Sequence, residues 1–198
     1  MTDAVIIDSG GANLASLQFA FERLGATTRI SADAREIACA ARVVLPGVGS
    51  ARDAMMRLRL AGLTEVLPTL TCPVLGICLG MQLLFERSEE GETDCLGILP
   101  GTLRRLSPAE GRPVPHMGWN QLVPLRADPV LEGIVENDYV YFVHSFALPL
   151  ADTTVASTHY GAELSAIVRR DNFWGMQFHP ERSARVGAQL LSNFLRLA

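Results

Sequence analysis

The sequence predicts an open, mostly parallel and twisted α/β sheet with helices on both faces and added antiparallel strands in the second half. In the first half, short apolar runs bounded by turn residues alternate with helical patterns, which is typical of βαβ units. In the second half, short strand-like pieces are separated by Pro, Gly, Asn and Asp, which favours antiparallel ribbons. The chain has 198 residues, enough for one good core, so we expect residues 1–198 to form a single domain.

The first half begins with AVIID (4–8) as a strand. LASLQFAFERLG (14–25) follows as a helix that Asn13 caps and Gly25 ends. One face of this helix is apolar and carries Leu14, Leu17, Phe21 and Leu24. The later elements are strands at TTRI (27–30) and VVLPG (43–47), a helix over roughly 50–67, and a strand at PVLGI (73–77).

The second half changes character from about residue 96. Its strand-like pieces are TLRRL (102–106), QLVPL (121–125), YVYFVHSF (139–146), TTVASTH (153–159), LSAIVRR (164–170) and WGMQFH (174–179). A last helix over RSARVGAQLLSNFLRLA (182–198) closes the chain.

Charge and composition argue against several functional classes. The net charge is -4 and no Lys/Arg run occurs, so nucleic acid is not an expected partner. The start lacks a signal-peptide pattern and no apolar run approaches the ~18 residues of a spanning helix, so we expect a soluble, cytoplasmic protein. The four cysteines form no C-x-x-C pair, which favours reduced thiols. His116, His144 and His159 have no metal-ligand spacing, and we expect neither a metal nor a cofactor.

GICLG (76–80) follows an expected strand, at the sheet edge where parallel sheets bind ligands. Gly76 and Gly80 remove side chains where the backbone doubles back, so Cys78 can occupy a strained turn with its sulfur exposed, like a nucleophile elbow. A helix that begins at about Leu79 would direct its amides at the sulfur and favour the thiolate. For Cys78 in isolation, a buried structural cysteine is the better interpretation, because free cysteine is among the most buried residue types.

Two further stretches supply what a cysteine nucleophile needs. The Leu79 amide can stabilise an oxyanion, and PGVGS (46–50) offers a second donor because glycine permits a peptide flip. In GMQFHPERS (175–183), Pro180 favours an extended conformation before it, so His179 and Glu181 project to the same side. The combination predicts a Cys-His-Glu triad. SGGAN (9–13) lacks the full G-x-G-x-x-G spacing, and ordinary turn chemistry accounts for it better.

PVPHMGWN (113–120) leaves two interpretations open. It can be a packed turn with an aromatic plug, because Met117 and Trp119 lie near two prolines. It can also be a contact surface, since Trp and Met are enriched at interfaces.

These stretches carry a family resemblance that covers nearly the whole chain. GICLGMQLLFERSEEG (76–91) together with GMQFHPERS resembles the class I (triad) glutamine amidotransferases, which implies their flavodoxin-like fold. Within that family, VIIDSGGANLASLQFAFERLG, LPGVGS, VPHMGWN and YVYFVHSF are similar to the glutaminase subunits of imidazole glycerol phosphate synthase, of histidine biosynthesis.

The resemblance implies an activity, a set of site residues and a partner. Cys78 would attack the side-chain amide of L-glutamine, His179 would move protons and Glu181 would orient the histidine, with a glutamyl thioester as intermediate. By motif position, the resemblance adds an oxyanion hole at Gly47, Val48, Gly49 and Leu79, and glutamine contacts at Gln82, Glu90 and Ser145. Ammonia would pass to a (β/α)8-barrel cyclase subunit, for which resemblance and composition suggest a contact face at Trp119, Asn120 and Tyr141.

The sequence departs from the family at Ser9 and Ala12, where many members have tyrosine and glycine, and at Phe146, where tyrosine is common. Three alternatives stay open. An amidotransferase could feed another synthase, such as the anthranilate or aminodeoxychorismate enzymes, although VPHMGWN argues against this. A free-standing γ-glutamyl hydrolase would be active alone. A non-catalytic binding subunit would retain the fold, although an intact Cys-His-Glu set argues against it.

Overall fold

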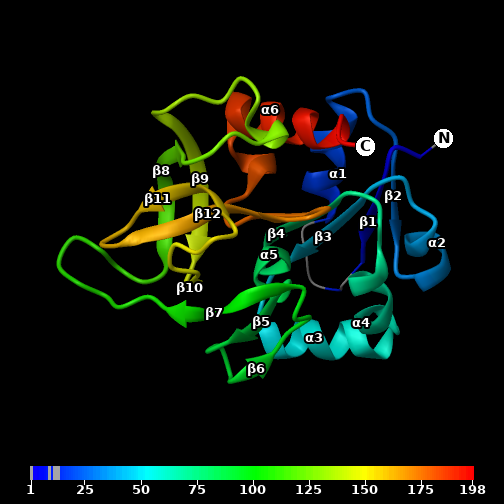
Figure 1. Cartoon of the computed structure of the whole chain (residues 1–198), viewed down its shortest axis with the longest axis horizontal. Coiled ribbons are helices and arrows are strands. Elements are labelled where there is room, and N and C mark those ends of the chain that lie inside the picture. The colour runs from blue at the N-terminus through cyan, green and yellow to red at the C-terminus, as the bar shows by residue number, and fades with distance from the viewer. Residues whose placement is uncertain (1, 9, 11–13) are drawn as a thin grey trace.

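A computed structural model describes residues 2–8, 10 and 14–198. Its main feature is a nine-stranded mixed sheet with the order β2-β1-β3-β4-β13-β12-β11-β8-β9 (Figure 1). A smaller sheet of four strands has the order β10-β7-β5-β6. The predicted α/β class is therefore confirmed. The expected helix cap Asn13 and the departures Ser9 and Ala12 lie outside the described residues.

The first half of the chain forms the parallel part of the main sheet. Its strands are β1 (Ala4–Ile7), β2 (Thr28–Ser31), β3 (Val43–Gly47) and β4 (Val74–Cys78). Its helices are α1 (Leu14–Glu22), α2 (Ala34–Ala38), α3 (Ala51–Leu60), α4 (Leu63–Val66) and the 3-10 helix η1 (Leu67–Thr69). The pairs β1–β2, β1–β3 and β3–β4 are all parallel.

Two elements of this half differ from the sequence prediction. The helix expected over 50–67 is divided, because Gly62 adopts a left-handed conformation with φ +67° and ends α3 before α4 begins. Helix α2 was not predicted. Its N-cap Asp33 accepts hydrogen bonds from the backbone N–H groups of Arg35 and Glu36, a local stabilisation that apolar periodicity does not reveal in so short a helix.

The second half supplies the antiparallel strands that the sequence predicted, and most of them extend the main sheet. Its strands there are β8 (His116–Pro124), β9 (Asp138–His144), β11 (Thr154–His159), β12 (Glu163–Arg170) and β13 (Phe173–Met176). They pair antiparallel with one another, but β13 pairs parallel with β4, with Met176 opposite Ile77. The chain thus returns to the centre of the parallel sheet, next to the strand that ends at Cys78.

The smaller sheet contains two strands that were not predicted. Its members are β5 (Phe85–Ser88), β6 (Thr93–Asp94), β7 (Leu99–Arg105) and β10 (Phe146–Ala147). Strands β5 and β6 follow the short helix α5 (Leu79–Leu83), where the sequence pattern gave no strand. The remaining elements are the 3-10 helices η2 (Pro129–Leu131) and η3 (Pro180–Arg182) and the last helix α6 (Ala184–Leu195).

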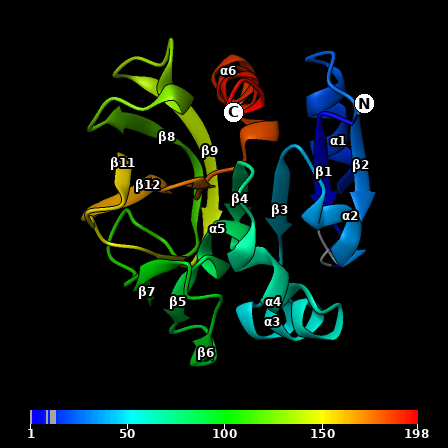
Figure 2. The same cartoon turned by 45° about the vertical axis from the view of Figure 1, so that its right-hand side comes forward.

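The core has two halves, one on each face of the main sheet. Alternate strand residues such as Ile6 and Val44 pack with α1 and α6, whereas Ile7 and Leu45 pack with α2, α3 and α4. Figures 1 and 2 show these helices in layers on either side of the parallel strands. Strands covered on both faces read as continuous apolar runs, as AVII and VVL do. None of the described helices is long and apolar enough to cross a membrane.

Candidate active site

Cys78 occupies a strained turn between β4 and α5, with φ 53° and ψ −113°. The two flanking glycines are required by close backbone approach. A Cβ on Gly76 would lie 2.7 Å from the carbonyl oxygen of Gly80, and a Cβ on Gly80 would lie 1.8 Å from that of Leu45. We expected an exposed sulfur, but Cys78 is only 8% accessible, so the sulfur does not lie on the outer surface. It faces a pocket instead.

Helix α5, which follows the turn, has only five residues. It therefore offers little more than one turn of aligned peptide dipoles to Cys78. The helix begins at Leu79, as the sequence predicted, and it is short because strand β5 begins at Phe85.

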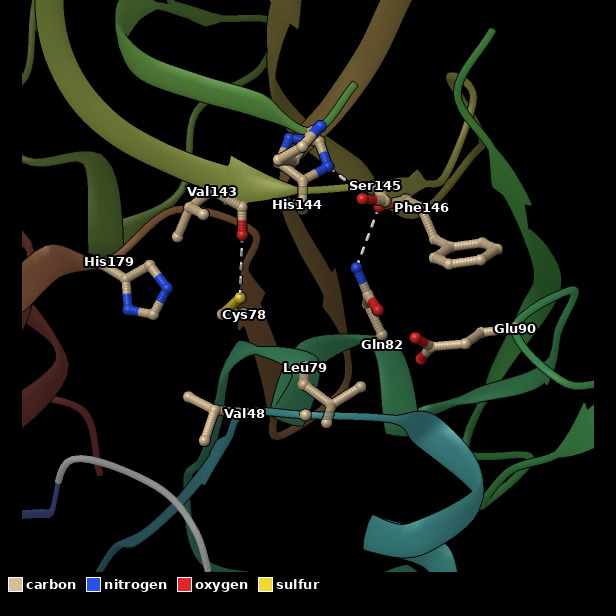
Figure 3. A pocket seen from close by; sticks show the side chains of 12 residues that line it. Val48, Cys78, Leu79, Gln82, Glu90, Val143, His144, Ser145, Phe146 and His179 are labelled. Carbon is tan, nitrogen blue, oxygen red and sulfur yellow. Dashed lines mark hydrogen bonds between the residues drawn. The ribbon is translucent and has the colours of Figure 1, made fainter. Parts of the chain in front are cut away.

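The pocket beside Cys78 has a volume of about 370 Å³. Figure 3 shows side chains from distant parts of the sequence converging on it. The predicted site residues that line it are Val48, Gly49, Cys78, Leu79, Gln82, Glu90, Ser145 and His179. Gly47 does not line this pocket: it pairs with Cys78 in the β3–β4 ladder and lines a smaller neighbouring cavity of about 240 Å³. Pro115, Val143, His144 and Phe146 also line the pocket, although no motif assigned them there.

His179 lies between β13 and η3, where it can contact both Cys78 and Glu181. Its Nδ1 lies 2.8 Å from Glu181 Oε1, so Nδ1–H donates to the carboxylate and Nε2 is left for the sulfur. The second carboxylate oxygen, Glu181 Oε2, is buried and has no hydrogen-bond partner among the described residues. The carboxylate is therefore committed to the histidine.

The electrostatic environment favours the charged form of His179. Burial opposes the charge, but hydrogen bonds and charge interactions with Cys78 and Glu181 outweigh it and raise the pKa of His179 to about 10. At neutral pH the imidazole is thus protonated, next to a sulfur that gains from a positive neighbour.

Ser183 holds the backbone of His179 in place, a role that the sequence did not suggest. Its Oγ donates to the His179 carbonyl oxygen at 2.6 Å and accepts from the Tyr141 N–H at 3.0 Å. The His179 N–H donates to the Tyr141 carbonyl oxygen at 2.9 Å. The three contacts form a closed ring between β9 and η3. Ser183 stands within GMQFHPERS, so only its position in that motif could have pointed to it.

Glu90 links the pocket to the glycine-rich loop PGVGS. Its Oε2 accepts the backbone N–H of Ala51, the first residue of α3, at 2.7 Å. Gly49 in that loop has φ +90°, and a Cβ there would meet nothing within 4 Å. The loop is therefore anchored at its end by Glu90 and α3, while Gly49 has room and the conformational freedom to reorient a peptide.

The predicted contact face lies on β8 and β9. PVPHMGWN is not a packed turn, because its second half forms β8, and Trp119 is 52% accessible instead of serving as a buried plug. The rings of Trp119 and Tyr141 are 6.0 Å apart in an edge arrangement. Asn120 differs from these two, since its amide is engaged with the His159 carbonyl oxygen at 2.9 Å.

Comparison with known families decides what this constellation belongs to. The sequence model of the family "Glutamine amidotransferase class-I" matches residues 5–198. The chain belongs to the class-I glutamine amidotransferases. Among curated relatives of this amidotransferase, "Imidazole glycerol phosphate synthase subunit HisH" of Xylella fastidiosa (strain Temecula1) is 55% identical over all of the chain and 98% of its own length. The protein of the same name from Xanthomonas campestris pv. campestris (strain 8004) is 54% identical over all of the chain and 99% of its length.

Solved structures of low sequence identity share the amidotransferase fold. A putative GMP synthase subunit from Thermoplasma acidophilum has a TM-score of 0.76 at 19% identity, covering 98% of this chain and 92% of its own. The structure of PurLQS from Thermotoga maritima has a TM-score of 0.76 at 20% identity, covering 97% of this chain and 96% of its own. The arrangement of strands is thus shared at sequence identities where few residues coincide.

The raised pKa of His179 makes the stability of this amidotransferase depend on pH. The folded chain keeps a proton that the unfolded chain releases above about pH 6.5. The stabilisation is therefore complete below that pH and is lost as pH rises towards about 10. Glu181→Gln weakens one cause of the shift, so we expect it to lose less stability over this window, by about 1 kcal/mol or more.

Urea unfolding at the two ends of the window measures this difference. His159→Gln, at an exposed histidine, is the matched control and should lose as much stability as the wild type. Equal losses in Glu181→Gln and the wild type would contradict the prediction.

Proposed function

We propose that this chain is the glutaminase subunit of an imidazole glycerol phosphate synthase and hydrolyses L-glutamine to glutamate and ammonia. The observation that carries the proposal is the single pocket that combines Cys78, the Glu181-oriented His179 and the glycine-rich loop. The choice of synthase, and with it of histidine biosynthesis, is supported by the 55% and 54% sequence identity, over all of this chain, to proteins named imidazole glycerol phosphate synthase subunit HisH.

The geometry suggests how the residues divide the reaction. The Cys78 thiolate attacks the side-chain carbonyl carbon of glutamine, and the imidazolium of His179 gives its proton to the leaving nitrogen, which departs as ammonia. A glutamyl thioester remains on Cys78. Neutral His179 then takes a proton from water as the water attacks the thioester, glutamate leaves, and the thiolate–imidazolium pair is restored. Glu181 keeps the ring in the Nδ1–H tautomer throughout.

The remaining pocket residues serve substrate placement and charge stabilisation. We assign the oxyanion formed at each attack to the amides around Val48, Gly49 and Leu79, with Gly47 fixing the start of that loop. Gln82, Glu90 and Ser145 are assigned to the polar groups of glutamine, with Glu90 suited to the α-ammonium by its charge. Because Glu90 also holds the first residue of α3, substrate binding and the position of the loop are connected.

The partner follows from the same proposal. The relatives are named as subunits, and we propose that ammonia passes to a (β/α)8-barrel cyclase subunit that binds Trp119, Asn120 and Tyr141. No cofactor is required by the chemistry. We place the complex in the cytoplasm, in keeping with four free cysteines, and take residues 1–198 as one domain.

Glutamate release from glutamine tests the function directly. The purified chain is measured alone and with a matching cyclase subunit that carries its nucleotide ligand. We expect release only in the mixture. Hydrolysis without an acceptor would waste glutamine, and the loop PGVGS can adopt its productive conformation only when the partner is bound. Equal release without the cyclase would indicate a stand-alone hydrolase, and no release in either case would return Cys78 to a structural role.

Trp119 tests the proposed contact face. Trp119→Ala removes a large exposed aromatic side chain and is expected to weaken cyclase binding by about 2 kcal/mol, roughly 30-fold in Kd. Titration calorimetry measures this change. Leu60→Ala on α3 is the control, because Leu60 is 82% accessible and lies outside β8 and β9. The same Kd for both variants would place the interface elsewhere.

A further inference from the structure

Two buried histidines outside the triad form a chain of hydrogen bonds that ends in the pocket. His116 and His144 stand opposite each other in the β8–β9 ladder, and His116 Nδ1 lies 3.0 Å from His144 Nε2. His144 Nδ1 lies 2.9 Å from the Phe146 carbonyl oxygen. At the other end, the Asn120 amide nitrogen lies 3.2 Å from His116 Nε2. The mechanism proposed above uses none of these contacts.

The two groups at the ends of this series of hydrogen bonds determine where the ring protons lie. The Phe146 carbonyl can only accept, so His144 carries its proton on Nδ1. The Asn120 nitrogen can only donate, and its orientation is supported by Oδ1, which accepts the Gln121 N–H at 2.8 Å. His116 Nε2 is then an acceptor, and His116 Nδ1–H donates to His144 Nε2. All of these hydrogen bonds can form together only when both rings are neutral, because a further proton would place two N–H donors opposite each other.

The surroundings keep both rings neutral and closely packed. They are 3% and 6% accessible, and burial lowers the pKa of His116 to about 4. Burial also dominates at His144, whose pKa falls to about 3 although the hydrogen bond to Phe146 opposes the shift. The ring of His116 stacks between Phe142 and Tyr160, with centroid distances of 4.8 Å and 3.9 Å.

The Phe146 carbonyl is the point where this chain meets the pocket. Gln82 Nε2 donates to the same oxygen at 2.9 Å and to Gln177 Oε1 at 2.9 Å. Figure 3 shows His144 and Gln82 approaching the carbonyl from strand β9 and helix α5. Because both amide hydrogens of Gln82 are used, its oxygen is the group that it can offer to a ligand.

We propose that His144, held in one tautomer by His116 and Asn120, is a positioning residue for glutamine. It fixes the Phe146 carbonyl, which in turn fixes the orientation of Gln82 and the Ser145–Phe146 wall of the pocket. The inference rests on the proposed function, because it assigns that pocket to glutamine. The hydrogen bonds among Asn120, His116, His144 and Phe146 do not reach Cys78 or Glu181. Loss of these bonds is therefore expected to affect substrate binding and to affect the chemical steps much less.

Steady-state kinetics of the complex with the cyclase subunit tests this role. His144→Leu removes the donor to Phe146 and is expected to raise KM for glutamine about tenfold, with kcat changed less than about threefold. His144→Asn restores a donor near the position of Nδ1 and is expected to bring KM back to within about threefold of the wild type. His159→Gln is the control of the same residue type and should leave both constants unchanged.

Nitrogen NMR of the histidine rings adds a readout that does not depend on catalysis. We expect Nδ1–H tautomers at both His116 and His144 in the wild type. Asn120→Asp keeps both rings but replaces the donor with an acceptor, and it also loses the hydrogen bond to the His159 carbonyl oxygen. It should move a proton to His116 Nε2 and, at saturating cyclase, raise KM as His144→Leu does.

Three results would overturn the positioning role: an Nε2–H tautomer at His144 in the wild type, an unchanged KM in His144→Leu, or a His144→Asn variant no better than leucine. A wild-type complex that releases no glutamate would overturn the proposed function as well. The two failures are therefore distinguishable.

Discussion

Cys78→Gly is expected to abolish glutamine hydrolysis and yet to be more stable than Cys78→Ala. Removal of a nucleophile costs a factor on the order of 10⁴ or more in kcat. The conformation at this position, with φ 53° and ψ −113°, is unfavourable for any residue with a Cβ. Such strain costs roughly 1–3 kcal/mol, whereas glycine loses more backbone entropy on folding by about 0.5–1 kcal/mol. The free energy of unfolding of the glycine variant should therefore exceed that of the alanine variant by about 1 kcal/mol.

Urea unfolding of the two variants, in parallel with glutamate release in the presence of the cyclase, measures both effects. The alanine variant is the matched control, because it lacks the sulfur but retains the strained Cβ. If Cys78→Ala were as stable as Cys78→Gly, the turn would not store strain. Substantial glutamate release by either variant would exclude Cys78 as the nucleophile.

Gly80→Ala is expected to be the most destabilising single methyl addition near the site. The added Cβ would lie 1.8 Å from the Leu45 carbonyl oxygen and 2.7 Å from its carbonyl carbon, so helix α5 would have to move away from β3. Both atoms belong to the backbone of a buried strand and cannot turn aside. We expect a loss of about 4 kcal/mol or more, which is exceptional for one substitution, and an inactive protein.

Gly111→Ala separates this clash from the ordinary cost of replacing glycine. Gly111 has φ +71°, and a Cβ there would meet nothing within 4 Å. We expect it to lose only about 1–2 kcal/mol, the cost of a left-handed conformation. Thermal unfolding measures the stability lost in each variant. Comparable losses would show that α5 and β3 can move apart at little cost in free energy.

The sequence predicted the parallel half of the sheet well because strands buried on both faces leave continuous apolar runs. It also placed Cys78 correctly in a turn, since Gly76 and Gly80 mark the close approach of α5. The family resemblance is confirmed. Strands β5 and β6 were missed because they are short, and β6 has only two residues, below the length at which alternation is visible.

Other parts of the site depend on contacts between distant residues. Ser183 and Tyr141 are 42 positions apart, and Gln82 and Gln177 are 95 positions apart. Local periodicity cannot predict such pairs. His116 and His144 looked scattered in the sequence for the same reason, since only the register of β8 with β9 brings their rings together. The roles assigned to individual site residues stay predictions until the variants are measured.

The strand order also explains how the geometry around Cys78 can be kept while other parts of the chain vary. Strands β4 and β13 are direct neighbours in register, although everything from α5 to β12 lies between them in the chain. The β4–β13 register therefore brings Cys78 and His179 to the same edge of the sheet, while the intervening segment supplies the Tyr141 contacts to His179 and Ser183 and part of the pocket lining. Changes of length in those parts of the segment that lie away from the pocket leave this register unaltered, which agrees with a fold shared with solved structures at 19% and 20% identity.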